Sequence, residues 1–517
     1  MDLGAAFETT FKLIFGECNL KLDELGPYLS RHHYSPIMRK SALSGKSVAL
    51  TSDRYCKGAK FISQDEVDFG KGYSLNVNEI KDIDSIVGAL SDRFYYTGNK
   101  IFGKSNDVQE SDGCFDSVHV KDSVNVEASK YVAYGSYVRG GCEFSFGSSY
   151  QLASKYTIKF MTGSYSSRCF ESYHTTNGSD LFFTYNCHGC SNVMFSFNLR
   201  SKKNCIGNLE LPMDKYAELR RKLIGESREY LEKHREFYSI LDYATPMKKL
   251  PAIKPIEERR GSDMGPIQTS FNSTCKVVFG TELGSIGDYA EYLNEGNPSI
   301  EKRRSVFGST VYPARTFFYY LVPQTRLVSN PEANEAGEKL RISLDGNENL
   351  ASLIKKLDAI AIYICEWNEG ENRNTIESPV VYSATNVYRS NASFSKNVGY
   401  HVMAQHSESI FGGFRMLQSK FCIRCSHSAR LVRCFEVSDS SDCTDSLFCH
   451  NCENLDNCMF CFNVKSKRYA IGNVEVGREN YMKVKKLVID GIVARLRKDR
   501  ALPLSIYNVA CYKPASN

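Results

Sequence analysis

Two stretches of the chain, far apart in the sequence, align with each other without a gap. Residues 168–208 and 433–473 both begin with Arg-Cys-Phe-Glu and both end with Ile-Gly-Asn. Upstream, TTFKLIFGE resembles STCKVVFGT, and RKSALSGKSV resembles RRSVFGSTV, so the relation extends over both halves. The sequence therefore predicts a tandem duplication of a module of about 250 residues.

Each module is expected to contain a head, a repeat body and a tail. The apolar runs FKLIF and FFYYLV predict strands in the heads, whereas residues 213–241, 348–360 and 478–500 have the apolar spacing of helices. The charge, proline and glycine between the modules are typical of a linker. The expected parts are an α+β head at 1–110, a β-solenoid body at 111–212, a helical tail at 213–247, a linker at 248–268, a second α+β head at 269–377, a second body with cysteine knuckles at 378–476, and a basic C-terminal helix and tail at 477–517.

The bodies carry short periods that favour a parallel β-solenoid, which stacks equivalent side chains about 4.8 Å apart. In the first body, small residues recur every six positions with valines between them, at Ser117, Val120, Ser123, Val126, Ser129, Val132, Gly135 and Val138. We expect the small residues at corners and the valines on faces. In the second body, cysteines recur every nine positions, at Cys425, Cys434, Cys443, Cys452 and Cys461. Both periods divide a coil of about 18 residues, which would stack Cys425, Cys443 and Cys461 in one column and Cys434 with Cys452 in another. The alternative is a twisted antiparallel sheet rich in serine and valine.

The cysteines of the second body form two C-x-x-C knuckles, at Cys449, Cys452, Cys458 and Cys461. Paired thiolates at that spacing can present sulfurs to one tetrahedral Zn²⁺, so we expect one zinc ion per chain. The spacer between the knuckles is short for a zinc ribbon, and a ladder of small buried cysteines is the alternative. Disulfides among them are the least expected outcome, because the compartment is expected to be reducing. The first module has Thr184, Cys187, Val193 and Ser196 at these positions and cannot form the same site.

The stretch from Cys452 to Tyr481, CMFCFNVKSKRYAIGN with a following helix that begins near ENY, resembles uncharacterised cysteine-rich repeat proteins of metagenomic microbial and phage origin. The resemblance covers about 50 residues in each half. It implies a cysteine-stabilised repeat fold and no particular activity. The first module departs from the pattern, because it lacks most of the knuckle cysteines.

Basic residues gather towards the end of the chain. The net charge is +6, and residues 478–500 hold eight Lys and Arg against three acids. Such a helix beside an aromatic-rich strand can contact a phosphate backbone, although a solvated helix face gives the same pattern. The candidate RNA-binding residues are Lys465, Lys467, Arg468, Lys483, Lys485, Lys486, Arg495, Arg497 and Lys498.

Signatures of catalysis are weak. Ser44-Gly45-Lys46-Ser47 resembles the end of a P-loop, but Lys40 stands where the motif needs glycine, so no nucleotide is expected. Asp439, Asp442 and Asp445 could supply paired carboxylates for carbohydrate chemistry, but solvated corner residues explain them more simply. No apolar run spans a membrane and the start has no basic leader, which predicts a cytoplasmic protein. We expect a non-catalytic structural or assembly protein that binds a protein partner or itself, with an RNA-binding or ribosome-associated factor as the alternative.

Overall fold

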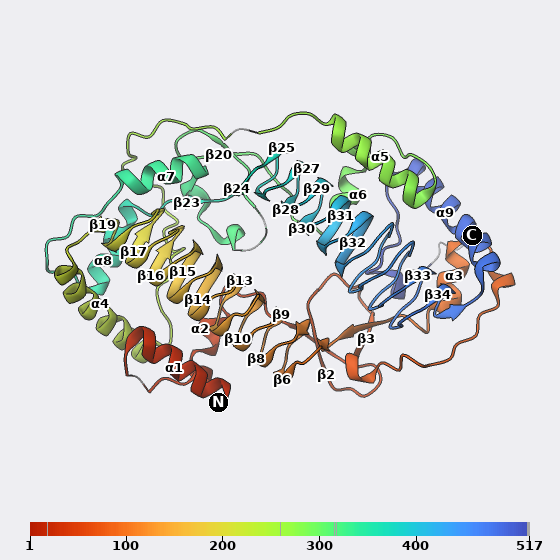
Figure 1. Ribbon diagram of the computed structural model, residues 1–517, viewed down its shortest axis with the longest axis horizontal. Coiled ribbons are helices and arrows are strands. Elements are labelled where there is room, and N and C mark those ends of the chain that lie inside the picture. Colours follow the sequence, from red (N-terminus) through yellow and green to blue (C-terminus); the bar gives the residue numbers. More distant parts are fainter. Residues whose placement is uncertain (18, 259, 315, 317, 514–517) are drawn as a thin grey trace.

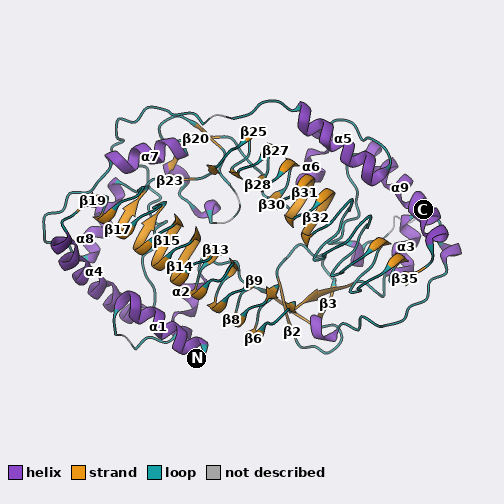
Figure 2. Cartoon of the chain, viewed as in Figure 1, coloured by secondary structure: helices purple, strands orange, loops and turns teal. Residues whose placement is uncertain are grey.

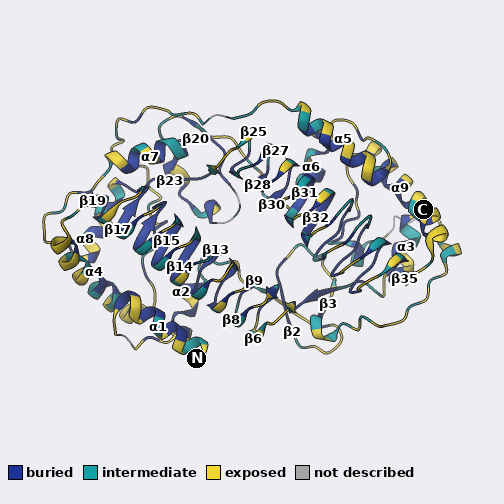
Figure 3. Ribbon diagram, in the orientation of Figure 1, coloured by how far each residue is buried: buried dark blue, intermediate teal, exposed yellow. Residues whose placement is uncertain are grey.

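The computed structural model describes all residues except 18, 259, 315, 317 and 514–517. The fold is mixed α+β and is dominated by two large parallel sheets that lie side by side, with helices along the outer sides (Figures 1 and 2). The strand stacks are mostly buried, whereas the outer faces of the long helices are exposed (Figure 3). No helix within the described residues is long and apolar enough to cross a membrane.

The two sheets are built from many short strands. The first sheet consists of β6 (Asn106–Gln109), β8 (Val118–Lys121), β9 (Val124–Val126), β10 (Lys130–Ala133), β11 (Ser136–Arg139), β12 (Glu143–Phe146), β13 (Ser149–Leu152), β14 (Lys155–Ser164), β15 (Ser167–Thr176), β16 (Ser179–Tyr185), β17 (Ser191–Phe197), β18 (Lys203–Ile206) and β19 (Leu209–Glu210), with the pair β5 (Ile101–Phe102) and β7 (Cys114–Phe115) beside it. The second sheet consists of β24 (Trp367–Glu369), β25 (Arg373–Ile376), β26 (Val380–Tyr382), β27 (Thr385–Tyr388), β28 (Asn391–Ser393), β29 (Lys396–Gly399), β30 (Val402–Gln405), β31 (Glu408–Leu417) and β32 (Lys420–Ala429). Isolated parallel bridges continue it to β33 (Asp456–Met459), β34 (Arg468–Ile471) and β35 (Val474–Glu475).

Pairing within both sheets advances by about one dozen residues. Lys155 pairs with Glu143 on one side and Ser167 on the other, and Lys420 pairs with Glu408 and Val432. The predicted period of 18 residues and its cysteine columns are therefore wrong. The six-residue period is half of one repeat of pairing, and the nine-residue period is a diagonal across it.

The backbone explains the diagonal. From Arg424 to Tyr469 every third residue has a positive φ, between 49° and 57°. Each such left-handed residue turns the chain, and the residue after it points inward. Aspartate and asparagine tolerate this conformation better than most residues and occupy many of these corners. A twelve-residue repeat therefore has four inward positions, which in the second sheet hold mainly cysteine, serine, valine and leucine.

Serine behaves differently from the prediction. Ser117, Ser123 and Ser129 lie inside the first sheet beside the valines, not at the corners, which belong to residues such as His119 and Asp122. The Ser117 hydroxyl donates to the Phe115 carbonyl (2.8 Å) and accepts from the Ser129 amide (3.2 Å). A small hydroxyl is favoured inside because it satisfies backbone groups that the repeat leaves unpaired.

Four long helices cover the sheets: α1 (Leu3–Phe15) and α4 (Met213–His234) on the first, α5 (Gly265–Phe279) and α9 (Arg478–Asp499) on the second. The tail helices α4 and α9 confirm the predicted apolar spacing. The strand predicted at FKLIF is wrong, since these residues end α1. Ala6, Phe7, Phe11 and Ile14 are buried at helical spacing, so the short apolar run belongs to a longer stripe. In FFYYLV, Phe317 lies outside the described residues, and the described residues 318–322 contain a short 3-10 helix (Tyr319–Leu321) and no strand.

Each head packs against the sheet of the other half of the chain. The first head contains β1 (Ile37–Lys40), β2 (Ser47–Leu50), β3 (Lys60–Ser63), α3 (Ile83–Leu90) and β4 (Tyr95–Gly98), and it shares a core with the second sheet, α5 and α9. The second head contains β20 (Arg303–Arg304), β21 (Thr310–Val311), β22 (Leu327–Val328), α7 (Asn330–Lys339), α8 (Leu350–Lys356) and β23 (Tyr363–Ile364), and it shares a core with the first sheet, α1 and α4. In Figure 1 the orange α3 accordingly lies beside the blue α9. The short helices α2 (Gly26–Ser30) and α6 (Ala290–Asn294) stay with their own sheets.

We call the contact between the second head and the first sheet the first-sheet junction, and the contact between the first head and the second sheet the second-sheet junction. At the first-sheet junction, Asn198 Nδ2 donates to the Ile362 carbonyl (3.1 Å), and Tyr363 Oη donates to the Ile240 carbonyl (2.8 Å). The second-sheet junction has the corresponding bonds from Asn463 Nδ2 to the Tyr95 carbonyl (2.9 Å) and from Tyr96 Oη to the Ile506 carbonyl (2.8 Å). The same contacts thus recur in both halves with the partners exchanged.

Candidate functional site

The eight cysteines between Cys422 and Cys461 are all buried and have no disulfide partners. Every thiol lies near the carbonyl oxygen two residues earlier, at 3.2–3.6 Å, in the way that interior serine hydroxyls do. Burial raises the pKa of Cys422, Cys434 and Cys449 well above the ordinary value. These three thiols are therefore protonated, and the side chains of all eight cysteines fill the narrow interior.

The predicted zinc ligands Cys449, Cys452, Cys458 and Cys461 belong to this interior. Cys449 and Cys461 are one repeat of pairing apart and face the same side, while the other two occupy neighbouring columns. Their sulfurs are directed at carbonyl oxygens, and the described part of the chain contains no group of three or more His, Cys, Asp or Glu side chains placed to hold a metal ion. This geometry fits the packed ladder better than a zinc knuckle, and the zinc site stays a prediction.

Elemental analysis of the protein purified without chelator tests the zinc prediction. The ladder geometry favours the result that no zinc is found and that Cys452→Ser and Cys187→Ser lower the free energy of unfolding by similar amounts, about 1–3 kcal/mol. One zinc per chain that is lost in Cys452→Ser, with a much larger loss of stability than for Cys187→Ser, would establish the metal site instead.

Most of the predicted RNA-binding residues already have partners within the chain. Ion pairs join Lys465 to Glu453 (2.7 Å), Arg468 to Asp456 (2.7 Å), Lys486 to Asp490 (2.5 Å) and Arg495 to Asp84 (2.6 Å). Arg497 donates to Thr281 Oγ1 (2.8 Å), and Lys485 is half-buried and donates to the Asp445 carbonyl (3.4 Å). Lys467, Lys483 and Lys498 form no ion pair with any residue that the structure describes. The structure does not gather the nine residues into one free basic surface.

The three aspartates at three-residue spacing are corner residues, with φ of 50°, 55° and 51°. Asp442 pairs with Arg430 (2.6 Å) and Asp445 with Arg433 (2.6 Å), both through bidentate contacts. Asp439 alone is buried, against the first head. The carboxylates therefore do not face a common cleft.

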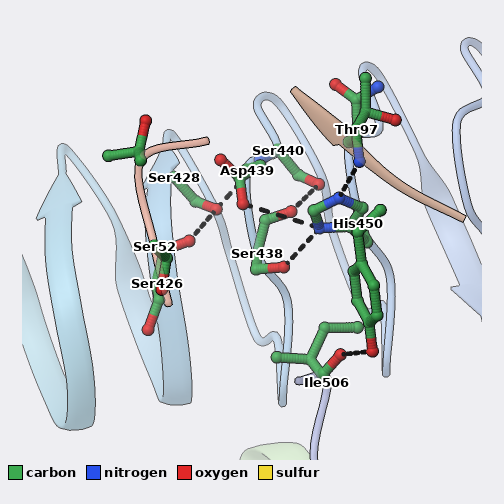
Figure 4. Close-up of polar contacts among 12 residues, drawn as sticks. Ser52, Thr97, Ser426, Ser428, Ser438, Asp439, Ser440, His450 and Ile506 are labelled. Atoms are coloured by element: carbon green, nitrogen blue, oxygen red, sulfur yellow. Dashed lines mark hydrogen bonds and ion pairs between the residues drawn. The ribbon is translucent and has the colours of Figure 1, made fainter. Parts of the chain in front are cut away.

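A buried polar network surrounds Asp439 at the second-sheet junction (Figure 4). Lys100 Nζ, which follows β4 of the first head, lies 2.9 Å from Asp112 Oδ2 and 3.3 Å from Asp439 Oδ1. His450 Nδ1 lies 2.8 Å from Ser438 Oγ and 3.6 Å from Asp439 Oδ2. Burial raises the pKa of Asp439, but Lys100 and the two histidines His450 and His427 outweigh it, so this pKa is lowered. The network joins the first head to the second sheet by charge.

Ser438, His450 and Asp439 resemble a catalytic triad in composition but not in geometry. His450 Nε2 accepts the Thr97 backbone amide (3.2 Å), so Nδ1 carries the proton. Both Ser438 and Asp439 approach that protonated nitrogen. The imidazole therefore cannot take the serine proton as a general base does. All three side chains are closed off from solvent, and the group supports the junction rather than chemistry.

Acid is expected to weaken this junction. Burial, opposed by Asp439, lowers the pKa of His450 to about 4. Between pH 6.5 and 4 the unfolded chain takes up a proton at this residue and the folded chain does not, so stability falls as the pH falls. The shift corresponds to about 3 kcal/mol at pH 4. Urea unfolding at pH 7, 5.5 and 4 should show a steeper loss for the natural protein than for His450→Gln; equal slopes would contradict this role.

The structure also contains a disulfide bond that the sequence did not predict. Cys56 of the first head is bonded to Cys511 of the C-terminal tail, and both are half-exposed, unlike the buried free cysteines. The tail beside it contacts both the second sheet and the first head, because the Ile506 amide donates to Glu436 Oε2 (2.9 Å) and the Cys56 amide donates to the Tyr507 carbonyl (3.0 Å). These cysteines lie outside the periodic pattern, and that exclusion is the only signal the sequence offers.

No protein-family model matches the chain, and comparisons with curated proteins and with solved structures find no match either.

Proposed function

We propose that the chain is a non-catalytic structural or assembly protein, made of two copies of one β-solenoid module that cap each other. The β-solenoid is supported by the twelve-residue parallel pairing and the four corners per repeat. Duplication is supported by the junction contacts, because Asn198 and Asn463 occupy aligned positions and make the same bond in opposite halves. The observation that carries the proposal is this reciprocal capping, which gives one rigid body.

The surfaces that remain suit contact with proteins. Opposite charges one repeat apart stack as ion pairs on the outward sides, as in Arg168 with Asp180 (2.6 Å), Lys155 with Glu143 (2.9 Å) and Arg430 with Asp442. Such sides extend over several repeats, and the backbone repeat fixes their position. The buried charges of Lys100, Asp112 and Asp439 lie in the second-sheet junction, where they hold the first head to the second sheet. A stiff body with extended faces serves recognition or assembly, either with a protein partner or with further copies of the chain.

Light scattering and affinity capture test this proposal together. The purified protein should either form a defined oligomer or retain a protein partner after nuclease treatment and a wash at high salt. A strictly monomeric protein that retains no partner would contradict it. Retention of RNA that weakens steeply with salt, and is lost on charge reversal of Lys485, Lys486, Arg495 and Arg497, would support the RNA-binding alternative instead.

A further inference from the structure

Residues 260–263 of the predicted linker, which we call the strap, lie across the starting edge of the second sheet. The Gly261 amide donates to the Thr375 carbonyl (2.8 Å), and Asn374 Nδ2 donates to the Asp263 carbonyl (2.8 Å). A side chain on Gly261 would overlap the Asn374 backbone, so glycine is needed for this close approach. The strap thereby leaves Thr375 of β25 only 8% exposed.

The first sheet begins with an edge of the same construction. Asn106 of β6 pairs with the next repeat as Arg373 of β25 does, and Asp107 is a left-handed corner like Asn374. β6 ends the sheet and pairs with β8 alone. Within the described ranges, no segment lies along its outward side as the strap lies along β25. Asn106, Asp107 and Gln109 are exposed, and the Asp107 side chain is 39% accessible.

The buried residue near each edge differs between the halves: Glu366 near β25 binds a cation of the strap, whereas Asn99 near β6 needs none. In the second half, the buried Glu366 carboxylate receives Arg260 of the strap (2.7 Å and 2.8 Å) and the Tyr312 amide (3.1 Å). In the first half, Asn99 takes the place of Glu366 and accepts the corresponding amide, from Ala49 (2.8 Å). Its amide group donates to Ser47 and Ser63, so no cation is needed there. The first edge is therefore stable while it is open.

We propose that β6 is a docking edge that takes an extended, lysine- or arginine-bearing segment of a protein partner as an added strand. The proposal rests on the proposed function in protein contacts and names the surface that makes them. Exposed strand edges recruit extended segments through backbone hydrogen bonds, and side chains set the choice of segment. The charge around this edge is acidic, with Asp107, Glu110, Asp116 and Asp122 against Lys104 and Lys121.

This charge also argues against a second copy of the chain as the occupant. Pairing β6 with β6 of another copy would place Asp107 and Glu110 opposite the same acids. Like charges directly opposite each other in neighbouring strands are destabilising. A basic segment with a glycine over Asp107 reproduces what the strap does at Asn374 and adds attraction between opposite charges.

The test uses the whole protein and a peptide probe built on the strap. The probe has the sequence of residues 254–264 with Glu257→Lys and Glu258→Lys, and its control also carries Gly261→Val, which keeps the charge but blocks close approach. Hydrogen exchange should be slowed by the probe at residues 106–110 and not at residues 373–377, which are already covered. The control peptide should bind about tenfold more weakly or not at all.

Protein variants complete the test. Asp107→Lys with Glu110→Lys should weaken the probe about tenfold or more, whereas Glu453→Lys with Asp456→Lys, far from this edge, should not. The proposal would be overturned if the two peptides bound equally well, or if the probe protected other residues or none. Self-association through β6 would also contradict it, because the segment bound at this edge would then come from a second copy of the chain. If a captured partner is retained by Asp107→Lys with Glu110→Lys, the role in protein contacts stands and the edge assignment fails.

Discussion

Replacing Lys100 with methionine is expected to lower the free energy of unfolding by about 3–5 kcal/mol, because it leaves two carboxylates without their cation in a buried place. Lys100 Nζ contacts Asp112, Asp439 and the Thr97 carbonyl (3.0 Å), and the residue is only 5% exposed. Burial lowers the pKa of Lys100, but the two aspartates outweigh it and raise the pKa above its ordinary value. This amine therefore stays charged and fixes the first head to the second sheet.

Equilibrium urea unfolding measures this loss, and Lys155→Met is the matched control. Lys155 pairs with Glu143 at 2.9 Å on an exposed side of the first sheet, where such a pair is worth about 1 kcal/mol or less. Adding Asp112→Asn and Asp439→Asn to Lys100→Met should recover part of the stability, since the stranded charges are removed. Equal losses for Lys100→Met and Lys155→Met would contradict the network.

Valine at Gly207 or at Gly472 is expected to lower the free energy of unfolding by about 2–5 kcal/mol, and by similar amounts at the two positions. The glycines have φ of 59° and 53°, where a side chain costs about 1–2 kcal/mol. An added Cβ would overlap Ile342 of the second head at Gly207 and Leu90 of the first head at Gly472. Overpacking adds about 1–3 kcal/mol to the cost at each junction.

Gly45→Val separates the two costs. Gly45 lies between β1 and β2 with a φ of 75°, and a Cβ there would meet no atom within 4 Å. Urea unfolding should therefore show only the backbone cost of about 1–2 kcal/mol at Gly45. If Gly207→Val is tolerated like Gly45→Val while Gly472→Val is not, the two junctions are not equivalent and reciprocal capping loses its support.

The repeating parts of the fold could be predicted from the sequence. Serine and valine alternate in the first body because both point inward, and the spacing of Asp439, Asp442 and Asp445 reports the corners. The length of the repeat was predicted wrongly, because a period of six fits coils of 12 and of 18 residues, and the nine-residue cysteine spacing, which is a diagonal in the structure, favoured 18. The helix at FKLIF was missed because a short apolar run reads equally as strand or buried helix.

The contacts between the heads and the sheets could not be predicted from the sequence, for a different reason. Similar halves show which residues correspond, but not whether a head packs on its own sheet or on the other one. Lys100 and Asp439 meet only because the heads are exchanged, and neither stands in a recognisable motif. The cysteines are a further case: their knuckle spacing predicts a zinc site, which stays a prediction, whereas only the structure shows that their thiols lie next to carbonyl oxygens.

Peptide mapping of the protein under non-reducing conditions shows whether the two heads are exchanged between the sheets. Cys56 belongs to the first head and Cys511 to the C-terminal tail that follows α9, and they are 455 residues apart in the chain. The folded protein is first oxidised mildly and is then unfolded in the presence of an alkylating reagent. Digestion should then yield one pair of linked peptides, which contain Cys56 and Cys511. Full alkylation of both cysteines, or a link from either to another cysteine, would contradict the exchange.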